Sequence, residues 1–335
     1  MSQATIKDIA KSLNLSPSTI SRALRDHPDI SSKTKGRVTS YAKGIDYFPD
    51  SIAQSLKNGR TKTIGVIVPE IKHDFFSSVV SGIEEIAYQR GFTIILCQSN
   101  ESYEREVINT KALASHLIAG LLVSISQSTV NGDHFKTLLK RGIPIVFFDR
   151  VCEGINASKV VVDDFQGAFD AVEFLIKSGY KKIAHIAGPQ NLMISTERMR
   201  GYIEALRKYE LPVRTDFIIF AGMSEEDGIT GLEKLYTLAD KPDAVFAVND
   251  PVAIGVYMKI KQLGLQIPKD VGVIGFSNNS ISSLINPPLT TVEQPSYEMG
   301  KEAAKLLIKQ ITLNDGNFSA EKLKLKTKLI IRESA

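Results

Sequence analysis

The first 47 residues show the hydrophobic spacing of three short helices. Ile6, Ile9, Ala10 and Leu13 recur at intervals of three and four residues, the spacing of a helix that buries one face. Two similar stripes follow, Ile20, Ala23 and Leu24 and then Val38, Tyr41, Ala42 and Ile45. We therefore predict an all-α head at the N-terminus.

The break between the first two predicted helices runs only from Asn14 to Ser16. Ser16 is a favourable N-cap, and Pro17 fits the first helical position because its missing N–H needs no partner there. Thr5, followed by Asp8, predicts a variant of the capping box at the start of the first helix. Two capped helices joined by so short a turn indicate a helix-turn-helix.

Residues 46–62 connect the head to the rest of the chain. They contain one short predicted helix, from Asp50 to Asn58, which Gly59 ends. An isolated helix of about nine residues is not stable in water. We therefore expect this segment to need a partner in order to fold.

From residue 62 onward, strand-like apolar runs alternate with amphipathic stretches. The runs begin in two sets, at Ile64, Phe92, Ala119 and Pro144 and then at Lys182, Phe217, Ala244 and Val271. Strands about 25–35 residues apart with helices between them are typical of parallel sheets. We predict an α/β fold with two doubly wound parallel-sheet lobes. A final helix at 299–310 and a strand at 326–332 fit either lobe.

Charge and composition narrow the range of functions. The 335 residues are 43% hydrophobic and 23% charged, which excludes a disordered chain. Residues 1–60 carry ten Lys and Arg against five Asp, although the whole chain has a net charge of only +4. This indicates a polyanionic partner for the head. No apolar run is long enough for a bilayer and no secretory signal is evident, so we expect a cytoplasmic protein without membrane contact.

The sequence carries no signature of catalysis. The run GFSNN resembles a nucleophile elbow after a strand, but Asn279 replaces the final glycine and no histidine follows Ser277. The two cysteines and five histidines lack metal-ligand spacing, and no phosphate-binding glycine motif occurs. We expect a protein that is not an enzyme and uses no cofactor or metal.

The run SPSTISR at 16–22 is the sharpest functional feature. With the apolar stripe packed inward, Pro17, Ser18, Ser21 and Arg22 face outward from the first turns of the second helix. These turns reach base edges when a recognition helix enters the major groove. Arg22 is the only long charged donor among them and suits a guanine or a phosphate. The alternative is a solvated face with capping serines, which the charge of the head disfavours.

The segments TIKDIAKSLNLSPSTISRAL and YFPDSIAQSLKNGRTKTIGVIVP resemble the N-terminus of the lac repressor/galactose repressor family of bacterial transcription regulators. The similarity continues through PIVFFDR, VVVDD, HIAGP, ERMRGY, VNDPVAIG, VGVIGF and PPLTTVEQP. The resemblance implies a homodimeric repressor of palindromic operator DNA, with a core like that of periplasmic sugar-binding proteins. A small effector, a sugar or a sugar derivative, is expected between the lobes.

The resemblance also implies a division of the chain into three parts. These are a helix-turn-helix DNA-binding domain at 1–47, a hinge helix or linker at 48–61 and an effector-binding core at 62–335. Lobe one of the core then comprises residues 62–161 and 294–324, and lobe two residues 162–293 and 325–335.

The family's DNA-contacting positions carry over to this sequence. Operator-facing positions correspond to Ser16, Pro17, Ser18, Ser21 and Arg22, and phosphate-contact positions to Thr5, Thr34 and Tyr47. Leu56 matches the hinge leucine, an apolar wedge that unstacks a base step in the minor groove and kinks the duplex. Packing of Leu56 against the core is the alternative.

The family's cleft-lining positions correspond to Phe76, Asp149, Arg198, Met223, Asn249 and Ser277. Asp149 and Asn249 also follow predicted strands, and ligands of open α/β sheets bind at the carboxyl ends of strands. Core packing is the alternative for Phe76 and Met223, and a cap or a salt bridge for Asp149. Many family members have Asp where Ser277 stands, and that carboxylate would repel an anionic ligand. With Ser277 in its place and Arg198 nearby, we expect the effector to be a sugar derivative with an acidic or phosphorylated group.

Two other classes of protein share parts of this pattern. A solute-binding protein of a transport system has the same two lobes, but a basic helical head and a missing signal peptide count against it. An enzyme would need a nucleophile, metal or cofactor site. We therefore predict a DNA-binding transcriptional regulator.

Overall fold

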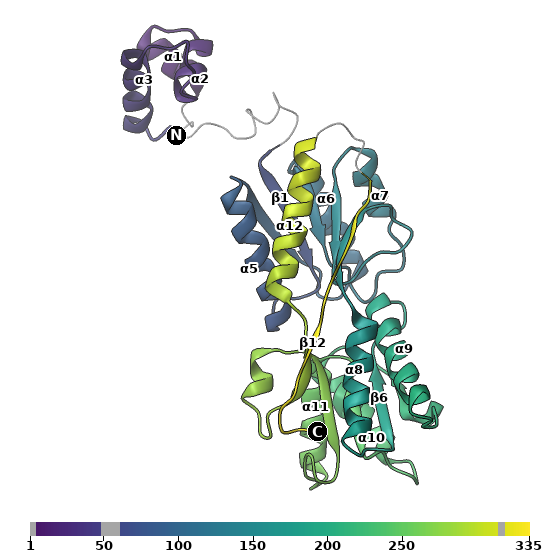
Figure 1. Cartoon of the computed structure of the whole chain (residues 1–335). Coiled ribbons are helices and arrows are strands. Elements are labelled where there is room, and N and C mark those ends of the chain that lie inside the picture. Colours follow the sequence, from purple (N-terminus) through teal and green to yellow (C-terminus); the bar gives the residue numbers. More distant parts are fainter. Residues whose placement is uncertain (1–4, 48–60, 314–318) are drawn as a thin grey trace. The chain divides into compact units, whose positions relative to one another are not determined.

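The computed structural model describes residues 5–47, 61–313 and 319–335. The chain divides into two compact units, residues 1–61 and 62–335 (Figure 1). The predicted hinge helix at 50–58, including Leu56, lies outside the described residues.

The first unit, which we call the head, contains three helices, α1 (Ile6–Leu13), α2 (Pro17–Leu24) and α3 (Ser32–Gly44). The apolar stripes form its core, in which Ile9, Ile20 and Val38 are fully buried. The predicted capping box at Thr5 is present, and Ser16 caps α2. The helix-turn-helix predicted from these caps is confirmed.

Lobe one of the second unit is a parallel sheet of six strands in the order β11-β5-β4-β3-β1-β2. Helices α5 and α12 pack on one face and α6 and α7 on the other. Its elements are β1 (Thr63–Val68), α5 (Asp74–Gln89), β2 (Thr93–Gln98), α6 (Tyr103–Ser115), β3 (Gly120–Val123), α7 (Asp133–Lys140), β4 (Ile145–Phe148), β5 (Ser158–Val162), α12 (Ser296–Leu313) and β11 (Lys322–Leu325).

Lobe two is a second six-stranded sheet, in the order β12-β10-β9-β8-β6-β7, with α8 and α9 on one face and α10 and α11 on the other. Its elements are α8 (Asp164–Lys177), β6 (Ile183–Ala187), α9 (Met193–Lys208), η1 (Thr215–Phe217), β7 (Ile218–Phe220), α10 (Glu225–Tyr236), β8 (Ala244–Ala247), α11 (Asp250–Gln262), β9 (Gly272–Ser277), η2 (Ser280–Ser283), β10 (Thr290–Glu293) and β12 (Lys328–Ile330).

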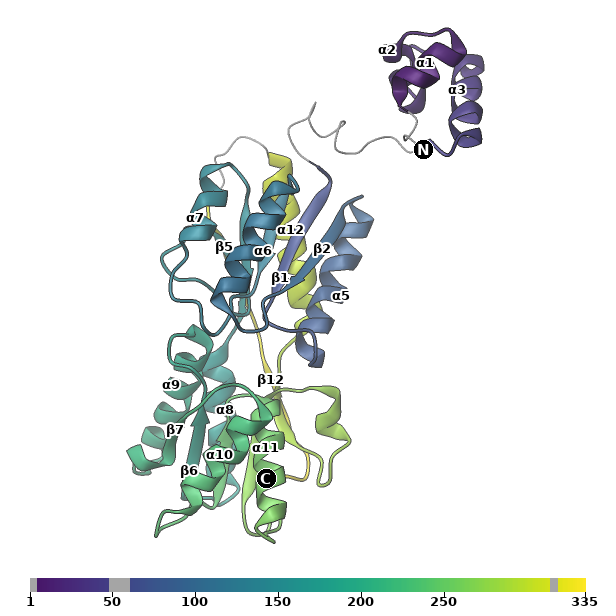
Figure 2. The same cartoon turned by 180° about the vertical axis from the view of Figure 1, so that it is seen from behind.

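The chain passes between the lobes after β5, after β10 and after β11, as Figure 2 shows from behind. The helix predicted at 299–310 is part of α12 in lobe one, and the strand predicted at 326–332 is the shorter β12 in lobe two. β12 runs antiparallel to β10, unlike the other strand pairs of the two sheets. The two predicted α/β lobes are confirmed.

The helices α5 and α12 cross so closely that two glycines are required. A Cβ atom on Gly82 would lie 2.1 Å from the carbonyl oxygen of Tyr297, and one on Gly300 would lie 2.0 Å from that of Val79. Any larger residue at these positions would push the two helices apart.

Candidate DNA-binding face and effector cleft

The N-terminal turns of α2 present a small polar surface. Ile20 points into the core of the head, whereas Pro17, Ser18 and Arg22 are exposed and Ser21 is half-buried. The hydroxyl of Ser16, also exposed, accepts the backbone N–H of Thr19 at 3.1 Å. The helix start is therefore fixed by its own cap, and the side chains beyond it face solvent.

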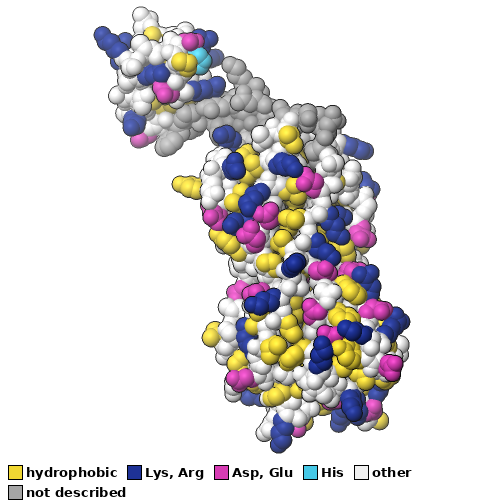
Figure 3. Space-filling model, viewed as in Figure 1, with side chains coloured by type: hydrophobic (Ala, Val, Ile, Leu, Met, Phe, Trp, Pro, Cys, Tyr) yellow, Lys and Arg dark blue, Asp and Glu magenta, His cyan; other side chains and the backbone are white. Residues whose placement is uncertain are grey.

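The other DNA-contact candidates in the head have structural partners. Thr5 is exposed and caps α1, where its Oγ1 donates to Asp8 at 2.7 Å. Thr34 shares a 2.9 Å hydroxyl contact with Ser31, the N-cap of α3. Tyr47 is half-buried and packs at the edge of the core of the head. Figure 3 shows Lys and Arg side chains spread over the visible face of the head.

The six residues that we predicted for the effector site line one cavity of about 420 Å³ between the two lobes. They are Phe76, Asp149, Arg198, Met223, Asn249 and Ser277. Three of them lie at the carboxyl ends of β4, β8 and β9, where open α/β sheets bind ligands. A larger cavity of about 920 Å³, which includes Cys152 and Arg200, contains none of the six.

Asp149 is a buried carboxylate with few partners. It is 4% exposed, and Nε2 of Gln294 donates to its Oδ1 over a long 3.5 Å. Nε of Arg150 lies 3.9 Å from its Oδ2. Burial raises the pKa of Asp149, while Arg150 and Arg198 oppose this rise. Much of its hydrogen-bonding capacity is therefore unused.

Arg198 is fully engaged inside lobe two. Its Nε and Nη2 contact Oδ1 of Asp164 at 2.8 and 2.7 Å, and its Nη1 donates to the carbonyl of Val248 at 2.7 Å. The guanidinium also lies 3.7 Å from the ring centre of Phe276. Burial raises the pKa of Asp164 to about 6, although Arg198 opposes this rise. Each nitrogen of the Arg198 guanidinium therefore already has a protein partner at the wall of the cleft.

The remaining predicted residues in lobe two are held by local contacts. Asn249 caps α11 and donates from Nδ2 to the carbonyl of Met223 at 2.9 Å. Ser277 donates to Oε1 of Gln294 at 3.0 Å and has a φ of 131°, in the region that favours glycine. Phe76 is 5% exposed and belongs to the core of lobe one, so it serves both the core and the cavity wall.

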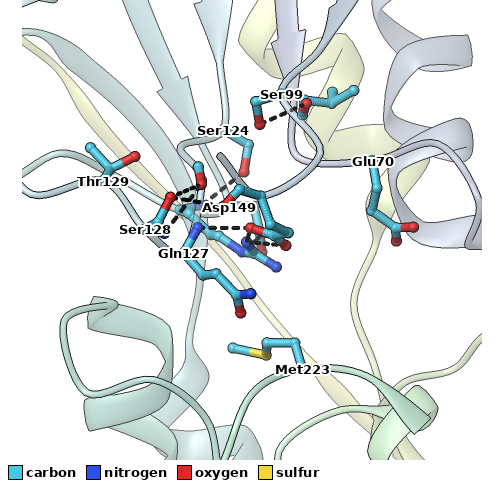
Figure 4. A network of polar contacts seen from close by, with 12 residues as sticks. Glu70, Ser99, Ser124, Gln127, Ser128, Thr129, Asp149 and Met223 are labelled. Carbon is cyan, nitrogen blue, oxygen red and sulfur yellow. Dashed lines mark hydrogen bonds and ion pairs between the residues drawn. The ribbon is translucent and has the colours of Figure 1, made fainter. Parts of the chain in front are cut away.

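A loop of lobe one is fixed beside the cleft by Glu101. This carboxylate accepts the backbone N–H of Gln127 at 2.7 Å and contacts Nη1 of Arg150 at 2.8 and 2.9 Å. A buried second carboxylate, Glu106, accepts the backbone N–H of Ser126 at 2.7 Å. Figure 4 shows the side chain of Gln127 extending from this loop toward lobe two.

Many further residues of the cleft were not predicted from the sequence, and five of them are Glu70, Glu101, Gln127, Arg150 and Gln294. Each of these five follows the end of a strand by four residues or fewer, after β1, β2, β3, β4 and β10. The carboxyl-end rule that selected Asp149 and Asn249 therefore applies to all five.

Hydrogen bonds between the lobes occur at two places beside the cleft. The hydroxyl and the N–H of Ser280 both donate to Asp74, the latter at 2.8 Å, and these bonds hold the pKa of Asp74 below its usual range. On the other side, Nδ2 of Asn191 donates to the carbonyl of Gln127 at 2.7 Å. Separating the lobes would break both contacts.

Charged groups surround the rim of the cleft. Nε2 of His73 lies 3.8 Å from Glu70 and 3.9 Å from Glu225, and Nζ of Lys72 lies 3.7 Å from Glu225. Burial raises the pKa of Glu70, and His73 opposes this rise. His73 therefore belongs to the cleft wall.

Comparison with known proteins identifies the family. Residues 5–50 match the model of bacterial regulatory proteins of the lacI family, and residues 172–335 match a periplasmic binding protein-like domain. The HTH-type transcriptional repressor PurR of Vibrio parahaemolyticus is 31% identical over 333 residues, which are 99% of this chain and 98% of PurR. The chain belongs to the lacI family. It is a DNA-binding transcriptional regulator with a helix-turn-helix head and a ligand-binding core, not a transport protein.

Solved structures of the lacI family share this fold. The complex of the transcriptional regulator CelR with cellobiose has a TM-score of 0.76 at 27% identity, over 99% of this chain and 100% of CelR. The lac repressor dimer bound to operator has a TM-score of 0.86 over 99% of both chains, and its 22% identity supports the fold alone. Among the described residues, no helix is long and apolar enough to cross a membrane.

Proposed function

We propose that this lacI-family regulator binds palindromic operator DNA as a homodimer, and that a sugar or sugar derivative in its cleft changes operator affinity. The observation that carries this proposal is the cavity of about 420 Å³, lined by both polar and apolar side chains, at the strand ends of a chain that also has a helix-turn-helix. Because operator DNA lies in the cytoplasm, the proposal places the protein there and gives it no catalytic role.

The proposal assigns base contacts to the N-terminal turns of α2, where a recognition helix meets base edges. The assigned residues are Ser16, Pro17, Ser18, Ser21 and Arg22. Thr5, Thr34 and Tyr47 are assigned to phosphates, and Leu56 to a wedge in the minor groove. The exposure of the face around Ser18 and Arg22 supports this assignment.

The homodimer follows from the symmetry of such operators. A two-fold dimer places two recognition helices about one turn of DNA apart, so its operator is an inverted repeat. The lac repressor neighbour, which is a dimer on its operator, supports this part of the proposal.

The sugar follows from the chemistry of the cleft. Asp149 offers buried acceptor positions for hydroxyl groups, and Phe76 and Met223 offer apolar surface for the C–H groups of a sugar ring. The cellobiose complex of CelR supports a sugar in this position.

Selection of binding sites from random DNA by the full chain tests the DNA part. We expect enrichment of one inverted repeat whose half-site centres lie about 10 base pairs apart, and a dimer in light scattering. Failure to enrich any inverted repeat, or a monomer on the selected DNA, would refute this part.

A further inference from the structure

The cleft wall carries more negative than positive charge. Five carboxylate side chains line it, from Glu70, Glu101, Asp149, Glu225 and Asp227. Only three Lys and Arg side chains do so, from Lys72, Arg150 and Arg198. An excess of one sign in a concave site favours ligands of the opposite sign.

The three cations are also committed to protein partners. Arg198 contacts Asp164 at 2.7 Å, Nη1 of Arg150 contacts Glu101 at 2.8 Å, and the exposed Lys72 lies 3.7 Å from Glu225 at the rim. Within the described part of the cleft, each Lys and Arg side chain therefore already pairs with a carboxylate of the protein.

Three of the carboxylates lack such close cationic partners. One of them, Asp227, instead accepts the backbone N–H groups of Gly222 and Ser224, both at 2.9 Å. Asp149, which is 4% exposed, has its nearest cationic nitrogen 3.9 Å away, on Arg150. Glu70, whose side chain is 22% exposed, has the imidazole of His73 at 3.8 Å and a backbone hydrogen bond from Lys72. Figure 4 shows Glu70 and Gln127 on opposite sides of the same space, above Met223.

Two buried polar atoms on residues of the same wall have no hydrogen-bond partner among the described residues. Nε of Arg150, a residue that is 6% exposed, makes no hydrogen bond with any described residue, and the same holds for Oε1 of Gln127. Buried polar atoms are rarely left unpaired in native structures. Nε of Arg150 suits a hydroxyl or ring oxygen of a ligand, and Oε1 of Gln127 suits a hydroxyl or an amine.

We propose that the effector is a hydroxylated amine of the amino sugar class, with hydroxyl groups at Asp149 and Arg150 and its protonated amine at Glu70. This proposal rests on the proposed function and names the ligand class of the same cleft. Hydrogen bonds between charged groups are about twice as strong as neutral ones, and partial burial protects them from screening by salt. An acidic sugar would meet repulsion from the same carboxylates.

Calorimetric titration of the full chain with matched sets of ligands tests the proposal. Each set contains a neutral sugar, its amine and its uronic acid, for example glucose, glucosamine and glucuronate, and the panel includes galactose and disaccharide counterparts. We expect one amine to bind about tenfold tighter than its neutral counterpart, and its acid to bind weakest. The proposal is overturned if no amine binds, or if a neutral or acidic member binds as tightly as the amine.

Two variants connect the preference to Glu70. Glu70→Gln should reduce the difference between amine and neutral sugar to less than threefold, with little change for the neutral sugar. Glu84→Gln removes an exposed carboxylate of α5 outside the cleft wall and should keep the full preference. If the preference for the amine over the neutral sugar were the same in the two variants, the role of Glu70 would be contradicted.

Operator binding, measured on the same preparations, separates the two proposals. Selection of an operator together with sugar binding that shows no amine preference would refute only the ligand class. Failure of the chain to bind any operator would refute the proposed function itself.

Discussion

At the scale of residues, some side chains of the cleft are fixed by hydrogen bonds within the protein, whereas others have unused hydrogen-bonding capacity. Arg198 and Asn249 are fixed by partners in lobe two, whereas Asp149 is buried beside a single 3.5 Å hydrogen bond from Gln294. The sequence identified Arg198 by resemblance. The ion pair between Arg198 and Asp164, 34 residues away, could not be predicted from the sequence, because it depends on how α8 and α9 pack.

His185 predicts a measurable pH dependence of stability. It is fully buried between Tyr202 and Phe246, and burial lowers its pKa from 6.5 to about 4. His185 therefore becomes protonated near pH 6.5 in the unfolded chain but only near pH 4 in the folded chain. The stability that this neutral histidine contributes is complete above pH 6.5 and is lost as the pH falls toward 4.

We expect the wild type to lose about 2–3 kcal/mol more unfolding free energy than His185→Phe between pH 7.5 and 4.5, since phenylalanine does not titrate. Urea unfolding of both proteins at the two pH values measures these losses. Carboxylates contribute equally to the loss in both proteins, so their contribution cancels when the two losses are subtracted. Equal losses in the two proteins would show that His185 is not the responsible group.

Arg22 gives a second prediction at the scale of single residues, which concerns operator binding. Arg22→Ala should weaken binding to the selected operator by about 1–3 kcal/mol and relax base preference at one position of each half-site. The exposed Arg37 of α3 lies outside the proposed reading face, so Arg37→Ala should affect selected and random DNA alike. If Arg22→Ala reduced the affinity for selected and random DNA equally, Arg22 would be a phosphate contact and not a base contact.

At the scale of elements, a continuous apolar run predicts the buried central strands of both sheets and also the more exposed edge strands β2 and β7. Every residue of β3 and β4 is buried, and both are plain in the sequence. The pattern did not predict β10 or β11. In β11, lysine and leucine alternate at an exposed edge, and β10 is a short strand that begins with two threonines. Such strands form because they pair with adjacent strands of the sheet, and a local hydrophobic pattern does not show that pairing.

The crossing of α5 and α12 gives a prediction at this scale. Gly82→Ala should destabilise the core by about 1–3 kcal/mol, because the new methyl group would lie 2.1 Å from the carbonyl oxygen of Tyr297. Ser81→Ala, one residue away on the exposed side of α5, should change stability by less than about 0.5 kcal/mol. Urea unfolding distinguishes them, and equal stability of the two variants would contradict the close packing.

At the scale of the whole molecule, the sequence predicted a basic helical head and two α/β lobes because each of these has its own hydrophobic period. It did not predict how the final helix and strand divide between the lobes. That division depends on the three passages of the chain between the sheets, which link segments far apart in the sequence. The cleft lies where these passages bring the strand ends of both lobes together.

The central claim is that occupancy of the cleft controls operator affinity. Fluorescence anisotropy of the selected operator, with and without the tightest ligand from the calorimetric panel, tests it most directly. We expect the ligand to change the Kd of the operator about 5–150-fold in the wild type. Asp149→Asn should bind the operator normally but respond only at much higher ligand concentration. A ligand that saturates the cleft and leaves the operator Kd unchanged would contradict the claim.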